Sequence, residues 1–346
     1  MPDETGLSYD DVLLVPRRSP VDSRDDVDLT TELADGLAMS LPVLSAAMDS
    51  VTETAMARAV AEAGGMGVIH RFLPVDEQAA MVRDVAEEGH PVAGAIGIAE
   101  DYEARGAALV DAGAAMLVVD VAHGHLERAI EATRVLADEF PETPVCSGNV
   151  VTREGVADLA SAGADCVKVG VGPGSHCTTR EVTGFGVPQF TAVERCVAEG
   201  RARGVSIVAD GGIRTSGDAV KALLVGADAV MMGGFFAGCE EAPGELVDVD
   251  GELHKQSRGM STAAAAEDRA DKEVEVHADE GVEAVSRYVG AVEPHLAEFA
   301  AGIRSGLSYA GAHDLQTARE NAEFMQVTGS TKHRNGAHTF ARTEHR

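Results

Sequence analysis

The sequence contains no tryptophan, and aromatic residues make up only 4% of its 346 residues. Lysine is also scarce: it occurs only at positions 168, 221, 255, 272 and 332, so arginine supplies most of the positive charge. The formal net charge is −29. A surface this acidic argues against binding nucleic acid or an anionic membrane through bulk electrostatics. In a folded chain it favours a halophilic protein, because concentrated salt screens the self-repulsion of the surface.

Long apolar segments are absent as well. No apolar run approaches the roughly 18 residues of a membrane-spanning helix, and the N-terminus lacks the basic-then-apolar pattern of a secretory signal. Cysteine occurs at positions 146, 166, 177, 196 and 239, without a CxxC or Cys/His metal spacing. The odd count and the scattered positions favour reduced thiols. We therefore expect a soluble, cytoplasmic protein that binds neither nucleic acid nor membrane.

Short apolar runs rich in β-branched residues predict eight strands, over 42–48, 66–70, 92–98, 116–121, 145–150, 167–171, 206–210 and 229–232. Patterns rich in alanine and charged residues lie between most of these runs and predict helices, for example over 54–63, 127–139 and 153–162. Several of the helices end in Ala-Gly-Gly or Ala-Gly-Ala, which is the expected C-terminal stop. Eight strands that alternate with helices predict a (β/α)8 TIM barrel. The alternative is an open, doubly wound sheet, although no G-x-G-x-x-G motif follows the first strand.

Two long segments interrupt this alternation. A loop over about 170–190 follows the sixth predicted strand, and an insertion over about 240–290 separates the eighth strand from the last barrel helix, near 292–303. Long insertions in a barrel are usually lids or binding loops. Both segments begin at the carboxyl end of a strand, where barrel active sites lie. The charged part of the second insertion is either a solvated surface or a flap over the barrel mouth.

The first of these segments carries Cys177 in a glycine-dense loop, directly after the apolar run 166–169. Glycine allows the backbone to approach a ligand closely and to adopt positive φ. A cysteine held there, next to threonine hydroxyls, is placed as a nucleophile. A lone cysteine after a glycine-rich turn is more often inert, so the nucleophile depends on the motifs at the other strand ends.

Glycine pairs follow the seventh and eighth predicted strands, at 211–212 and 233–234. These two strand ends are the usual place for a barrel to bind phosphate through backbone N–H groups, although each pair alone could be a tight turn. Asp210 could accept hydrogen bonds from ribose hydroxyls. Asp120, at the mouth of the fourth strand, is either functional or part of a structural ion pair. The histidines at 123, 125 and 176 lack the spacing of a zinc site, so we expect no catalytic zinc.

Taken together, these motifs resemble the IMP dehydrogenase/GMP reductase family over nearly the whole chain. The segments that carry the resemblance are 11–16, 47–52, 148–152, 184–189 and 209–212, together with the cysteine loop. The resemblance implies a (β/α)8 barrel, a homotetramer, a purine nucleotide monophosphate as substrate and a nicotinamide cofactor. The regulatory CBS domains that are common in the dehydrogenases have no room between the second and third predicted strands.

The two branches of the family are harder to separate. The barrel segments 48–52, 69–71, 122–125 and 212–214 look like the dehydrogenase. The flap within the insertion looks like the reductase, because it reads Gly-Met-Ser at 259–261 and only twenty-one residues separate Gly259 from Glu280. This stretch lacks the Arg-Tyr pair with which dehydrogenases activate water. We therefore expect a GMP reductase, which converts GMP to IMP and ammonia with NADPH. The alternatives are an IMP dehydrogenase without CBS domains, which oxidises IMP to XMP with NAD, and a catalytically silent nucleotide-binding regulator.

The resemblance also implies roles for individual residues. Cys177 would attack C2 of the purine, while Thr179 and Glu280 would manage the proton of the leaving amine. The implied nucleotide contacts are Ser175, Asp210, Gly211, Gly212, Gly233, Gly234, Gly259, Met260 and Ser261. The implied cofactor contacts are Asp120, Val121, Ala122, Val171 and Gly172.

Three further expectations follow from the resemblance. The carbonyl groups around Gly172, Gly174 and Cys177 could hold a monovalent cation such as K+. The family's tyrosine just before the Gly-Met unit, which contacts phosphate, has no counterpart at 256–258, so that contact is either lost or replaced by Arg258. His277 lies where a cationic cofactor contact is expected, which leaves the preference for NADPH over NAD open.

Overall fold

Eight parallel strands close into a barrel in the order β10-β11-β4-β5-β6-β7-β8-β9. The computed structural model describes residues 5–99, 101–260 and 280–332. The barrel strands are β4 (Val43–Ser45), β5 (Met66–Ile69), β6 (Val92–Ile96), β7 (Met116–Asp120), β8 (Val145–Val150), β9 (Cys166–Val169), β10 (Ser206–Asp210) and β11 (Ala229–Met232). The predicted TIM barrel is confirmed, and the pairing of β11 with β4 excludes an open sheet. Five predicted strands extended too far at their carboxyl ends, because the chain leaves the sheet at the barrel mouth to form loops.

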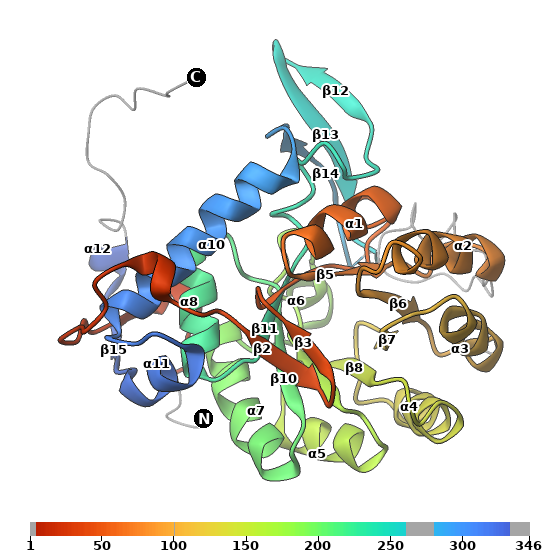
Figure 1. The fold of residues 1–346 in the computed structure, drawn as a ribbon, viewed down its shortest axis with the longest axis horizontal. Helices are drawn as coiled ribbons and strands as arrows, with labels where there is room; N and C mark the ends of the chain where they lie inside the picture. Colours follow the sequence, from red (N-terminus) through yellow and green to blue (C-terminus); the bar gives the residue numbers. More distant parts are fainter. Residues whose placement is uncertain (1–4, 100, 261–279, 333–346) are drawn as a thin grey trace.

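A helix follows each barrel strand and packs on the outside of the barrel (Figure 1). These helices are α1 (Thr54–Glu62), α2 (Val75–Ala86), α3 (Tyr102–Asp111), α4 (Glu127–Glu139), α5 (Arg153–Ser161), α7 (Gln189–Arg203), α8 (Ser216–Val225) and α10 (Val292–Tyr309). The glycine stops are confirmed: Gly113 and Gly163 adopt φ of 91° and 96°, in the left-handed region that favours glycine. Shorter helices are α6 (Thr179–Thr183), α11 (Leu315–Asn321) and α12 (Gly329–Lys332).

A hairpin that the sequence did not predict covers the amino end of the barrel. It consists of β2 (Thr31–Ala34) and β3 (Leu37–Met39). The Thr31 hydroxyl donates to the carbonyl of Asp228, just before β11, over 2.8 Å. The apolar residues of the hairpin belong to the same buried cluster as the inward-facing residues of the barrel strands. Near the two ends of the chain, β1 (Val12–Leu14) pairs with β15 (Phe324–Gln326).

The insertion after β11 forms a small antiparallel sheet that stands away from the barrel (Figure 1). Its strands are β12 (Leu246–Val249), β13 (Glu252–Arg258) and β14 (Glu283–Arg287). The insertion was predicted over about 240–290, but the sheet was not, because its strands carry mostly polar and exposed residues. We call this sheet the flap sheet. Residues 261–279, between β13 and β14, lie outside the described residues.

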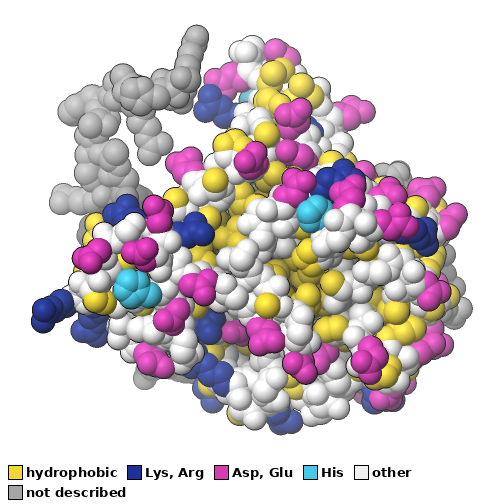
Figure 2. Space-filling model, in the orientation of Figure 1, with side chains coloured by type: hydrophobic (Ala, Val, Ile, Leu, Met, Phe, Trp, Pro, Cys, Tyr) yellow, Lys and Arg dark blue, Asp and Glu magenta, His cyan; other side chains and the backbone are white. Residues whose placement is uncertain are grey.

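The surface agrees with the composition. Acidic side chains are spread over the face shown in Figure 2, and hydrophobic side chains gather on the protruding sheet. Leu246, Leu253 and Val285 of the flap sheet are each about half exposed. Within the described ranges, no helix is both long enough and apolar enough to cross a membrane.

Candidate active site

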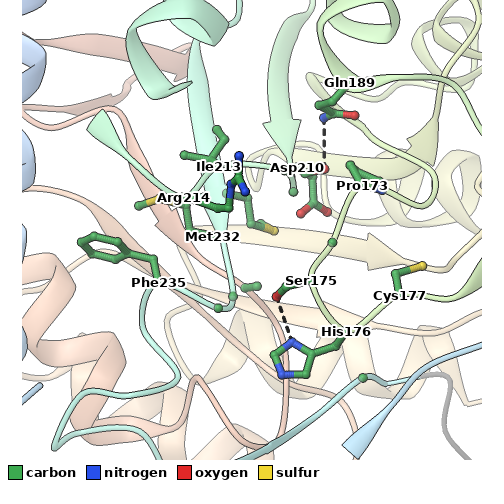
Figure 3. A pocket seen from close by; sticks show the side chains of 18 of the residues that line it. Pro173, Ser175, His176, Cys177, Gln189, Asp210, Ile213, Arg214, Met232 and Phe235 are labelled. Carbon is green, nitrogen blue, oxygen red and sulfur yellow. Dashed lines mark hydrogen bonds between the residues drawn. The ribbon is translucent and has the colours of Figure 1, made fainter. Parts of the chain in front are cut away.

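A cavity of about 740 Å³ opens at the carboxyl ends of the barrel strands. Its walls come from the loops after β4, β9, β10 and β11, from Asp120 at the end of β7, and from the two segments that flank residues 261–279 (Figure 3). The structure brings most of the predicted site residues to this cavity: Asp120, Gly174, Ser175, Cys177, Asp210, Gly211, Gly212, Gly233, Gly234, Gly259, Met260 and Glu280. Val121, Ala122, Val171 and Gly172 lie at the strand ends but outside the cavity wall, and Ser261 lies outside the described residues.

Cys177 begins a short chain of hydrogen bonds. Its Sγ lies 3.1 Å from Oγ1 of Thr179, and this hydroxyl donates to Oε2 of Glu280 over 2.7 Å. The backbone holds the same partners together, since the N–H of Thr178 donates to the carbonyl of Glu280 over 2.9 Å. A proton can therefore pass between the thiol and the carboxylate through one hydroxyl.

The other cysteines do not compete for this role. Cys146, Cys166, Cys196 and Cys239 are all buried, whereas Cys177 is half-buried. Burial raises the pKa of Cys196 and of Cys239 to about 12. A hydrogen bond from Cys146, together with burial, raises the pKa of Cys166 well above its usual value. Since the thiolate is the nucleophile, these thiols are inert, and Cys177 is the cysteine that reaches the cavity.

Glycines shape the part of the cavity that suits a phosphate group. Gly211 and Gly212 adopt φ of 89° and 75°, which turns the backbone sharply after β10. A Cβ atom on Gly234 would lie 2.8 Å from Oγ of Ser175, and one on Gly233 would lie 2.7 Å from Sδ of Met48. A side chain at either position would therefore close the space. The two strand-end loops and Ser175 form a cradle of neutral donors, which we call the phosphate cradle.

Lys168 is a site residue that sequence reasoning missed. It belongs to β9, is 1% exposed, and points its ammonium group toward the barrel mouth. Nζ donates to Oδ1 of Asp120 over 2.5 Å and to Oδ2 of Asp210 over 3.0 Å. A third bond, of 2.7 Å, reaches Oδ1 of Asn149. Burial alone would lower the pKa of Lys168, but the two carboxylates outweigh it, so its pKa is raised and the lysine stays charged.

Lys168 connects Asp120 and Asp210, which the sequence analysis treated as independent site residues. Asp120 and Asp210 both line the cavity, and both are paired with the same lysine. Asp120 is therefore part of an ion pair and also part of the cavity wall. The sequence could have indicated the role of Lys168, because it is a charged residue inside the apolar run 166–169 of a lysine-poor chain. A buried cation requires buried counter-charges, and the carboxylates at neighbouring strand ends were the candidates.

Arg258, at the end of β13, is held by the loop after β4. Its guanidinium forms two bonds, of 2.6 and 2.9 Å, to Oδ2 of Asp49, and its N–H donates to Oγ of Ser50 over 3.2 Å. The charge of Arg258 is thus compensated by the loop after β4, and Arg258 does not line the large cavity. Whether the tyrosine contact is lost or replaced by Arg258 stays open, and the pair with Asp49 fixes the end of β13 to the barrel.

His176 was considered only as a metal ligand, yet it is hydrogen-bonded on both sides. Its Nε2 lies 2.8 Å from Oγ of Ser257, and its Nδ1 lies 3.2 Å from Oγ of Ser175 (Figure 3). Burial lowers the pKa of His176, so the ring is neutral at neutral pH. Within the described part of the chain, no group of three or more His, Cys, Asp or Glu side chains is arranged to hold a metal ion.

Comparison with known proteins identifies the relatives of this chain. Residues 6–338 match the family model described as the IMP dehydrogenase / GMP reductase domain. The chain is 34% identical to the inosine-5'-monophosphate dehydrogenase of Nitrosopumilus maritimus (strain SCM1), across 93% of this chain and 96% of that protein. It is 33% identical to the enzyme of the same name from Staphylococcus aureus (strain Mu50 / ATCC 700699), with 93% of each chain covered.

Among solved structures, GMP reductase from Trypanosoma brucei in complex with guanosine 5'-monophosphate is similar, with a TM-score of 0.93 and 30% identity. The match covers 98% of this chain and 99% of that one. No CBS domain is evident in the present chain, because β5 is followed directly by α2 and β6. The sequence relatives and the structural relative thus carry the names of two different enzymes.

Proposed function

The chain belongs to the IMP dehydrogenase / GMP reductase family of nicotinamide-dependent oxidoreductases, and we propose that it is a GMP reductase. The observation that carries this proposal is the contact of Glu280 with the Cys177–Thr179 pair. A reductase needs a proton carrier beside the leaving amine, whereas a dehydrogenase needs a base for water in its flap. Glu280 suits the first role, and the stretch from Gly259 to Glu280 contains no Arg-Tyr pair for the second; the one Arg-Tyr pair of the insertion, Arg287-Tyr288, lies at the end of β14.

The proposed reaction begins when Cys177 adds to C2 of GMP. Its thiol proton passes through Thr179 to Glu280. Once the S–C2 bond has formed, the bond between C2 and the exocyclic amino nitrogen can break. Glu280 returns a proton to the amine, which leaves as ammonia and gives a thioimidate on Cys177. NADPH, when bound, supplies the hydride that C2 then receives. The S–C2 bond breaks with its electron pair on sulfur, and the products are IMP, NADP+ and ammonia.

The cavity offers matching positions for the nucleotide. The phosphate cradle, with Ser175, would hold the phosphate, and Asp210 would accept hydrogen bonds from the ribose hydroxyls. Gly259, Met260 and Ser261 would contact the base. Asp120, with the strand-end residues at 121–122 and 171–172, would face the nicotinamide. Lys168 would keep Asp120 and Asp210 in place and offset their repulsion.

Three properties of the protein in solution belong to the same proposal. The carbonyl oxygens of Gly172, Gly174 and Cys177 are hard neutral donors, which suit K+. The net charge of −29 and the scarcity of lysine support a halophilic, cytoplasmic enzyme. The exposed apolar residues of the flap sheet support assembly into the homotetramer that is usual in the family, because lone molecules rarely expose such patches.

The alternative, an IMP dehydrogenase without CBS domains, is favoured by the names of the sequence relatives. Two assays in molar KCl separate the two, each following the absorbance of reduced nicotinamide. A fall with GMP and NADPH, and no rise with IMP and NAD, is the expected result. A rise with IMP and NAD alone would make the protein a dehydrogenase. Tight GMP binding without turnover in either assay would indicate the silent regulator.

A further inference from the structure

His176 joins the flap sheet to the phosphate cradle through a continuous line of polar side chains. Its Nε2 faces Ser257 of β13 over 2.8 Å, and its Nδ1 faces Ser175 over 3.2 Å. Beyond the ring, Oγ of Ser257 lies 3.3 Å from Oγ of Ser286 in β14. His176 is only 8% exposed, yet it lines the cavity, so the imidazole is held in place at the cavity wall.

Ser175 is the member of this line that touches the phosphate cradle. A Cβ on Gly234 would lie 2.8 Å from its Oγ, which places the hydroxyl directly against the loop after β11. Figure 3 shows the Ser175 hydroxyl between the His176 ring and the loops that form the cradle. The direction of the Ser175 proton therefore decides whether this hydroxyl donates to an anion in the cradle or to the imidazole.

A neutral imidazole has one donor and one acceptor nitrogen. If Nδ1 accepts, the Ser175 proton points at the ring and is lost to the cradle. If Nδ1 carries the proton, it donates to Ser175, whose own proton is then free to point at the cradle, and Ser257 donates to Nε2. A phosphate dianion only accepts hydrogen bonds, so its presence selects the second arrangement.

We propose that His176 is a positioning residue for the nucleotide phosphate. It donates from Nδ1 to Ser175 and so directs the Ser175 hydroxyl at the phosphate, while Ser257 fixes the ring. The inference rests on the proposed nucleotide site and extends it. It assigns a part in phosphate recognition to a histidine and two serines, whereas Arg258 is paired with Asp49.

A purely structural role of the ring is a separate possibility with different consequences. The backbone already holds this loop to the flap sheet, since the N–H of Val282 donates to the carbonyl of His176 over 3.0 Å. Cys177 and Gly281 form a β-bridge next to it. Neither contact uses the imidazole, so replacing the side chain leaves the loop attached.

Three substitutions separate the two nitrogens of the ring. His176→Asn places an amide near the position of Nδ1, His176→Gln places one near Nε2, and His176→Leu removes both. The control is His125→Leu, because His125 pairs with Asp158 outside the cavity wall. For each protein, the dissociation constants of GMP and of guanosine are measured by calorimetry in molar KCl without phosphate buffer.

The ratio of the dissociation constants of guanosine and GMP distinguishes phosphate recognition from a structural role, because guanosine differs from GMP only by lacking the phosphate. In the Leu and Gln variants, we expect GMP to bind about tenfold more weakly, the scale of one hydrogen bond to a charged group, while guanosine binds as before. In the Asn variant and the control, the ratio should stay within about threefold of the wild-type ratio. The KM for GMP should rise in the Leu and Gln variants with little change in kcat.

Two results would overturn the proposal. An unchanged ratio in the Leu and Gln variants would remove His176 from phosphate recognition. Equal weakening of GMP and guanosine would show a structural role only. If the wild-type protein uses IMP rather than GMP, the proposed function fails, and the same ratio is measured with IMP and inosine. Wild-type protein that binds neither nucleotide would refute both proposals.

Discussion

Replacing Lys168 by methionine tests whether one buried cation organises the cavity. Methionine is similar in length and removes the charge, so the packing of β9 changes little. The substitution leaves Asp120 and Asp210 side by side without their shared counter-ion. We expect the protein to lose both stability and the geometry of the cofactor and ribose positions.

The size of the stability loss follows from burial. Removing one partner of a buried ion pair costs about 3–5 kcal/mol. Asp120 and Asp210 keep 25% and 19% of their side chains exposed, so water screens part of the repulsion and the lower value, about 3 kcal/mol, applies. With an unfolding entropy of about 2.1 cal/mol/K per residue, a chain of this length should lose about 4 °C in Tm. Misplaced carboxylates should lower kcat/KM by about 100-fold.

The control lies at the opposite end of the barrel. Arg319 keeps 14% of its side chain exposed and forms an ion pair of 3.2 Å with Asp228, just before β11, so Arg319→Met should lower Tm similarly and leave kcat/KM unchanged. Adding Asp120→Asn to Lys168→Met should recover part of the lost Tm, because one carboxylate then remains instead of two. Calorimetry and steady-state kinetics in molar KCl measure both effects. A Lys168→Met protein with wild-type Tm and kcat/KM would refute the reasoning.

Other predictions concern the nucleophile, its proton path and the pH range. Cys177→Ala should abolish hydride transfer and keep GMP affinity within about threefold, and residual turnover would exclude covalent catalysis. Glu280→Gln should slow ammonia release by about 100-fold or more in single-turnover assays, and near-normal turnover would remove Glu280 from the mechanism. Burial lowers the pKa of His176 and His295, so the unfolded chain binds protons that the folded chain does not. The free energy of unfolding should therefore fall as the pH drops below about 6.5, and His295→Gln should flatten this slope in urea titrations. Equal slopes in wild type and variant would contradict that assignment.

The barrel was predictable because each strand–helix unit carries its own local signal. Apolar runs of four to seven residues, helical patterns and glycine stops recur in order, and each of these signals lies within a short stretch of the chain. The loop around Cys177 was predictable for the same reason, since the glycines, the cysteine and the threonines are contiguous. The hairpin of β2 and β3 was not predicted, because its apolar residues pack against the barrel interior, and that interior exists only once the barrel has closed.

The contacts that organise the cavity were not predictable from local patterns. Lys168 meets Asp120 and Asp210 only because β9 lies next to β10 and within reach of β7, across the barrel mouth. Arg258 was one of two alternatives that the sequence left open for the phosphate contact of the missing tyrosine. Its actual partner, Asp49, lies 209 residues away in the chain. Such pairings depend on topology and on competition between nearby charges, and neither leaves a periodic pattern in the sequence.

The central claim is that Cys177 and Glu280 remove an amine from GMP. Its most direct test is the stoichiometry of the products after wild-type protein consumes a limited amount of NADPH with excess GMP in molar KCl. Ammonia is measured enzymatically, and IMP by chromatography. The account predicts one ammonia and one IMP for each NADPH oxidised. XMP and reduced nicotinamide formed from IMP and NAD, with no ammonia from GMP, would contradict it.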